Sequence, residues 1–118
     1  MLHLKRLGTL LLFSLCVQAL TVIPLADIAG DGNVHQFSTT IVGEVAIWVQ
    51  VVCSGTGTVR LGSSDVAPAA NVGIPCAAGG AYFYPIVPPT PGVHNRYDLS
   101  RLLFLAPSGA TVSITYAR

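Results

Sequence analysis

The chain has 118 residues, which suits a single domain. Hydrophobic residues make up 52% and charged residues only 9%, with a formal net charge of +1. This composition excludes an intrinsically disordered chain and argues against a nucleic-acid binder, which needs a basic surface. Because a surface so poor in charge makes a monomer poorly soluble, we expect copies of the chain or a partner to cover much of it.

The first 19 residues have the layout of a secretory signal. Lys5 and Arg6 precede an apolar run over residues 7–15, and small residues at 17 and 19 would allow cleavage after Ala19. The run is too short to span a membrane, which takes about 20 residues.

The alternative is that residues 1–19 are retained as an apolar N-terminal arm or short helix. Such an arm would bury side chains including Leu11 and Phe13 against a neighbour or the same domain. In both interpretations residues 20–118 form one domain.

From residue 20 onward the sequence is typical of strands. Short runs rich in Val, Ile, Thr and aromatic residues alternate with Gly, Pro, Asn and Asp. We expect about eight strands, at residues 20–25, 34–41, 45–53, 58–62, 72–76, 81–87, 101–106 and 110–117. This pattern predicts an all-β fold: a β-sandwich, jelly roll or small barrel.

Period-2 alternation in two of these strands indicates which residues are buried. Val49 and Val51 lie on one face of the strand at 45–53, and Ile114 lies on one face of the strand at 110–117. We expect these three side chains to share one core layer. Residues 54–57 have the composition of a hairpin turn, and Pro75 indicates an edge strand.

No catalytic or metal-binding pattern is found. His3, His35 and His94 are far apart and lack carboxylates at ligand spacing, so we expect no metal site. The Asp31-Gly32-Asn33 sequence favours a turn over a calcium loop. We therefore expect no enzymatic activity, no cofactor and no small-molecule substrate.

The aromatic residues and the cysteines each allow two interpretations of their role. Trp48 and the Tyr82-Phe83-Tyr84 cluster suit a core or a subunit interface, with a glycan-binding face as the alternative. Cys53 and Cys76 would form a disulfide in an exported protein and would be buried apolar side chains in a reducing compartment.

Five stretches resemble, in the same order, small β-rich virion structural proteins of tailed bacteriophages. They lie at 47–51, with its Trp-Val-Gln core, and at 58–66, 73–80, 97–100 and 106–116. The resemblance covers roughly residues 19–118, and residues 1–18 are additional to it.

The resemblance implies a capsid decoration or cement protein on the capsid surface. Such a protein would act as a homo-oligomer, expected to be a trimer, in contact with the major capsid protein. A head-fibre or tail component is a variant of this hypothesis. The alternative from another class is a glycan-binding module, secreted or periplasmic after cleavage at Ala19.

Overall fold

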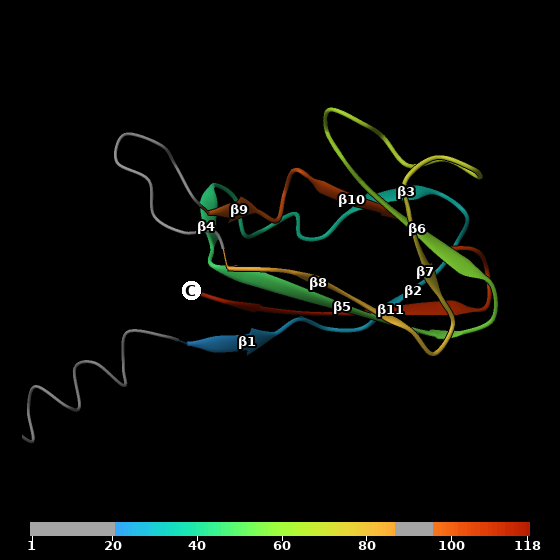
Figure 1. The fold of residues 1–118 in the computed structure, drawn as a ribbon, viewed down its shortest axis with the longest axis horizontal. Coiled ribbons are helices and arrows are strands. Elements are labelled where there is room, and N and C mark those ends of the chain that lie inside the picture. The colour runs from blue at the N-terminus through green and yellow to red at the C-terminus, as the bar shows by residue number, and fades with distance from the viewer. Residues whose placement is uncertain (1–20, 87–95) are drawn as a thin grey trace, which may run out of the picture.

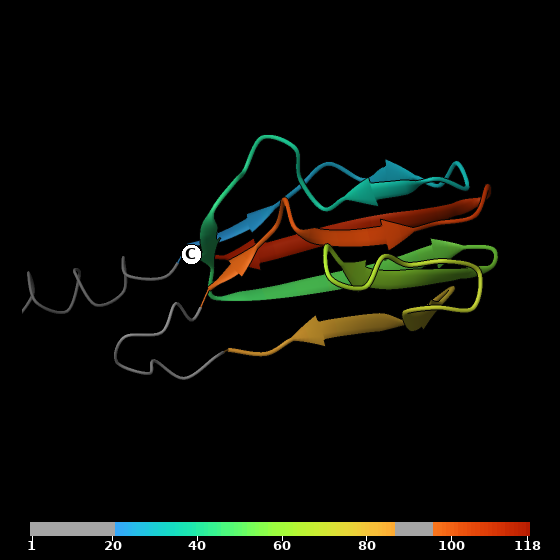
Figure 2. The ribbon, with the colours of Figure 1, turned by 90° about the horizontal axis from the view of Figure 1, so that it is seen from above.

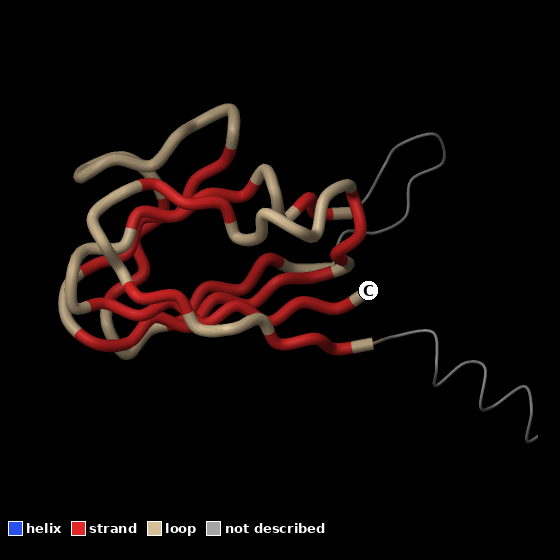
Figure 3. The backbone as a smooth tube through the Cα atoms, turned by 180° about the vertical axis from the view of Figure 1, so that it is seen from behind, coloured by secondary structure: helices blue, strands red, loops and turns tan. Residues whose placement is uncertain are grey.

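The fold consists of antiparallel β-sheets. In the computed structural model, residues 21–86 and 96–118 are described, and they form eleven strands and no helix (Figures 1 and 3). The strands are arranged in two facing layers, as in a β-sandwich. The all-β, sandwich-like prediction is therefore confirmed.

The first layer, sheet A, is built around the long strand β11 (Ala110–Ala117). One side of β11 pairs with β5 (Trp48–Gly55), and β5 pairs in turn with β8 (Ala81–Tyr84). The other side of β11 pairs with two short strands, β1 (Val22–Pro24) and β2 (Ile28–Ala29).

The second layer, sheet B, has the order β3 (Val34–Gln36), β10 (Leu102–Leu105), β6 (Thr58–Ser63) and β7 (Ile74–Ala77). Pro75 lies in the edge strand β7, as predicted, where its missing N–H removes no central ladder bond. A small separate sheet pairs β4 (Glu44–Ala46) with β9 (Tyr97–Asp98).

The core lies between sheets A and B. Val51 and Ile114 stand directly opposite each other on β5 and β11, and Val49 is also fully buried, which confirms the predicted shared layer. Sheet B contributes Val59, Leu61 and Phe104 from its inner face.

Two predictions about local structure were wrong. The single strand expected at 45–53 is two strands, because Ala46 and Val49 both enter the core although they are three residues apart. Strict alternation cannot bury both residues. The chain changes phase between them at Ile47, whose N–H donates to the Ala117 carbonyl.

The turn expected at 54–57 is present, but it does not close a hairpin. Gly55 and Gly57 have φ values of 85° and 92°, and the chain passes from β5 in sheet A to β6 in sheet B, which do not pair. The β7–β8 and β10–β11 connections also cross between sheets at this end (Figure 1). Backbone bonds tie the three arches together, from Thr56 N–H to Gly109 and from Ala78 N–H to Gly57.

The sequence analysis also missed short elements. Strand β2 lies in a stretch expected to be a loop, and β9 was not predicted. The N-terminal segment 1–19, with Leu11 and Phe13, lies outside the described residues, as does His94.

Candidate interaction surface

Sheet A contains no formal charge in its described strands. None of the residues of β1, β2, β5, β8 and β11 is Asp, Glu, Lys or Arg. Charged residues within other strands are Arg60 in β6 and Glu44 and Asp98 in the small β4–β9 sheet. A whole sheet without charge is unusual for a surface that only water contacts.

The outer face of sheet A carries an apolar patch, defined here as Val22, Trp48, Val52 and Phe83. The Trp48 and Phe83 rings lie 5.6 Å apart, centroid to centroid. Phe83, Val52 and Val22 are 51%, 40% and 54% exposed, respectively. The register places Ala117, fully buried, between Val22 and Trp48, so the patch continues from β1 across β11 to β5 and β8.

Polar side chains lie within this patch and beside it, because Gln50 and Thr115 form the row between Trp48 and Val52. Gln50 lies opposite Phe83 on one side and opposite Thr115 on the other. Ser113, beside Val52, donates a hydrogen bond of 2.8 Å to the Asp27 carboxylate from the β1–β2 segment. The outer face of sheet A therefore mixes apolar and polar side chains, as protein interfaces commonly do.

The predicted aromatic cluster is divided between the two faces of β8. Phe83 points outward to Trp48, whereas Tyr82 and Tyr84 pack against the core. The Tyr84 ring contacts Tyr82 at 4.8 Å, Tyr97 at 5.6 Å and Phe37 at 6.0 Å, all edge to face. Burial raises the pKa of Tyr84 above its ordinary value, with smaller contributions from the neighbouring tyrosines.

The structure therefore brings Trp48 and Phe83 together on one surface and places Tyr82 and Tyr84 elsewhere. Val22 and Val52 were missed as surface candidates. The alternation that buries Val49 and Val51 already put Val52 on the Trp48 face, so a signal for Val52 existed in the sequence. No such signal existed for Val22, because pairing of β1 with β11 is a long-range contact.

The outer face of sheet B is partly covered by its own chain. The β6–β7 loop folds back over it, burying Pro68. Side chains of this loop are held by hydrogen bonds such as that from Arg101 Nε to Ser64 Oγ, 3.1 Å. Figure 2 shows the layers from above, and Figure 1 shows this loop on the side away from sheet A.

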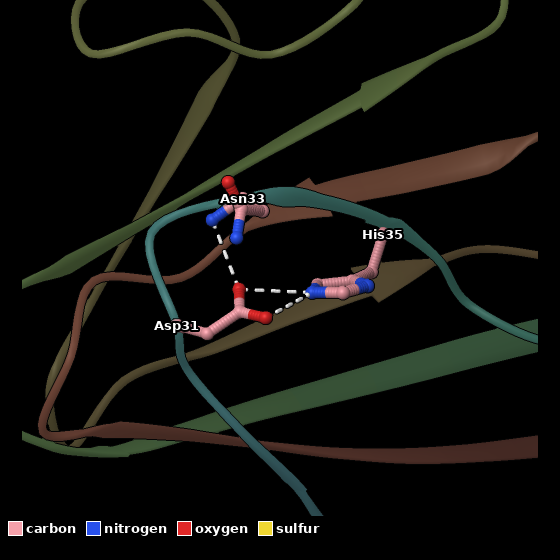
Figure 4. A network of polar contacts seen from close by, with 3 residues as sticks. All are labelled: Asp31, Asn33 and His35. Carbon is pink, nitrogen blue, oxygen red and sulfur yellow. Dashed lines mark hydrogen bonds and ion pairs between the residues drawn. The ribbon is translucent and has the colours of Figure 1, made fainter.

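Asp31, Asn33 and His35 form a polar cluster on the loop before β3 and on β3 itself (Figure 4). The Asp31 carboxylate accepts hydrogen bonds from the Asn33 N–H at 2.9 Å and from His35 Nε2 at 2.8 Å. These bonds, first that from Asn33, lower the pKa of Asp31. With Gly32 at a φ of 79°, the geometry is that of a turn, as predicted.

The other parts of the described chain show few features of a binding or catalytic site. No group of three or more His, Cys, Asp or Glu side chains there could hold a metal ion. No helix in the described ranges is long and apolar enough to cross a membrane. A groove of about 370 Å³ beside sheet B is lined by Gly32, Gly57, Thr58, Arg60, Ala70, Leu105 and Pro107.

Cys53 and Cys76, for which a disulfide was expected only in an exported protein, are neighbours. Cys53 of β5 and Cys76 of β7 are 1% and 3% exposed, and each carries a free thiol. Burial raises the pKa of Cys53 to about 12, with a hydrogen bond to the Cys76 thiol contributing to the shift.

Comparison with known proteins adds no relative. No protein-family model matches the chain, and no similar sequence was found among curated proteins and no similar fold among solved structures.

Proposed function

We propose that this protein is a structural component of a phage virion, a capsid decoration or cement protein that assembles as a homo-oligomer. The observation that carries the proposal is that the described strands of sheet A contain no charged residue and expose the patch of Val22, Trp48, Val52 and Phe83. The order of the five stretches that resemble phage virion proteins supports the virion context. A jelly-roll-like architecture is the finer fold that we associate with it.

The mechanism is mechanical. A rigid sandwich that packs repeatedly against copies of itself and against the major capsid protein distributes the outward force of packaged DNA over many contacts. Permanent contacts of this kind are more apolar than transient ones. Val22, Val52 and Phe83 are already about half-buried in the single chain. Burying the rest of each side chain therefore stabilises such contacts by about 1 kcal/mol per side chain, roughly half the value for a fully exposed one.

Self-association is tested first, by light scattering of the full chain at micromolar concentration. The wild type should have a multiple of the 12.3 kDa chain mass, expected to be three. The double variant V52K/F83K should shift to the mass of one chain, because two desolvated ammonium groups would oppose the contact. Thr58→Lys, at an exposed position of β6, is the matched control and should leave the oligomer intact. A wild type that stays monomeric would contradict the proposal.

The virion role is tested by fractionating an infected culture. The protein should copurify with particles and stay bound at about 1 M salt, where the screening length falls to about 3 Å, because exposed charge pairs are screened and apolar contacts are not. Finding the protein only in the medium or periplasm, shortened after Ala19, would refute the virion assignment. Glycan binding by that form would then support the exported module.

A further inference from the structure

Cys53 and Cys76 lie where the chain crosses between the two sheets. The Cys53 N–H donates to the Gly80 carbonyl at 2.9 Å, and its carbonyl accepts the Gly79 N–H at 2.8 Å. The β7–β8 arch is thus held against β5. Cys76 enters this arch from β7, where it is paired with Val59.

The two thiols lie close to each other inside the core. Both side chains belong to the same buried cluster, and the Cys76 thiol lies within hydrogen-bonding reach of Cys53. The thiols are on different sheets and far apart in sequence, so a bond between them would join β5 of sheet A to β7 of sheet B.

Burial also controls when such a bond can form. With exposures of 1% and 3%, neither sulfur can be reached by a dissolved oxidant while the core is closed. The thiolate is the attacking species, and the raised pKa of Cys53 keeps it protonated in the fold.

We propose that Cys53 and Cys76 form an inter-sheet disulfide site that is oxidised during folding and is closed to oxidants in the finished fold. The oxidant is a small disulfide such as oxidised glutathione. One protein thiolate attacks it, forming a mixed disulfide and releasing one reduced glutathione. The second thiolate then attacks the protein sulfur, forming the Cys53–Cys76 bond and releasing the second glutathione. Two thiol protons are released to solvent or to the leaving thiolates, so the two electrons lost by the protein reduce one glutathione disulfide.

This site concerns a bond within one chain and does not depend on whether copies assemble. It forms where the chain folds in the presence of an oxidant, and in a reducing compartment both cysteines keep their thiols. The test uses the full-length chain in two parallel samples with the same glutathione buffer. One sample is refolded from denaturant in that buffer, and the other is folded under reduction before the buffer is added. Intact mass after alkylation and peptide mapping report the state of each cysteine, including Cys16.

The refolded sample should lose the mass of two hydrogen atoms, map to a Cys53–Cys76 peptide and melt at a higher temperature than the reduced protein. The prefolded sample should keep both thiols and be oxidised only at its rate of unfolding. The proposal is overturned if the refolded chain carries mainly glutathione adducts or bridges to Cys16. It is equally overturned if the prefolded protein is oxidised as fast as the denatured chain.

Discussion

Truncating Ile114 to alanine tests the core layer that sheet A supplies. Ile114 is 1% exposed and stands opposite Val51 in the β11–β5 register. The substitution removes three buried carbon atoms, worth about 2.4 kcal/mol at about 0.8 kcal/mol each. The cavity that remains adds to this cost, and measured Ile-to-Ala losses span about 2–5 kcal/mol. We therefore expect Ile114→Ala to lower the free energy of unfolding by about 3–4 kcal/mol.

Urea denaturation followed by tryptophan fluorescence measures this loss, with Trp48 as the probe. Protein concentration is held fixed, because self-association makes stability concentration-dependent. Thr115→Ala is the control: its side chain lies next in the strand, on the opposite face beside Gln50, and should cost less than about 1 kcal/mol. An Ile114→Ala loss below about 1 kcal/mol, or a control that costs as much, would refute the assigned strand faces.

Three further predictions concern turns and titratable groups. Gly55 and Gly79 both have φ values above 80°, but an added Cβ would collide with the Gly109 carbonyl only at Gly55. Gly55→Ala should therefore lower the free energy of unfolding by about 1–3 kcal/mol more than Gly79→Ala does, as measured by thermal unfolding. The lowered pKa of Asp31 stabilises the fold above the ordinary value of 3.8, and this contribution is lost as pH falls through the lowered pKa. The melting temperature of Asp31→Asn should accordingly be below that of the wild type at neutral pH and should approach it near pH 2. The pKa of Cys53 is about 12 in the fold and 9.0 ordinarily, so the reduced protein should lose stability as pH rises between these values. The Cys53→Ala variant should lose less stability over the same pH range. Equal losses of stability in the two proteins would contradict the burial of this thiol.

Strand faces could be predicted from the sequence wherever one strand keeps one phase. Residues 110–116 alternate without interruption, and Val112, Ile114 and Tyr116 are all buried. The same alternation holds in β6, where Val59 and Leu61 are both buried. Alternation is a local property, because successive side chains of a strand point to opposite faces whatever the strand pairs with.

Pairing partners could not be predicted, because they depend on contacts between distant segments. The Gly-rich sequence at 54–57 is compatible with a hairpin and with an arch, and only the sheet that β6 joins distinguishes them. The phase change at Ile47 arises because β4 pairs with β9, about 50 residues away, whereas β5 pairs with β11. The lack of charge in sheet A was hidden for the same reason, since its strands are scattered along the chain.

The edges of the sandwich bear on how copies could associate. A sheet can add a neighbour at an open edge or pack through its face. Pro24 in β1 and Pro75 in β7 each remove a backbone donor from an edge, whereas β8, at the other edge of sheet A, contains no proline.

Edge addition at β8 would extend sheet A and bring two copies of the Trp48–Phe83 pair onto one continuous outer face. Lysine at position 83 lies on that edge strand as well as in the patch, and lysine at position 52 lies on β5, away from the edge. Separating V52K from F83K therefore distinguishes the two geometries: contact through the face requires both single variants to weaken the oligomer, and addition at the edge leaves V52K assembled.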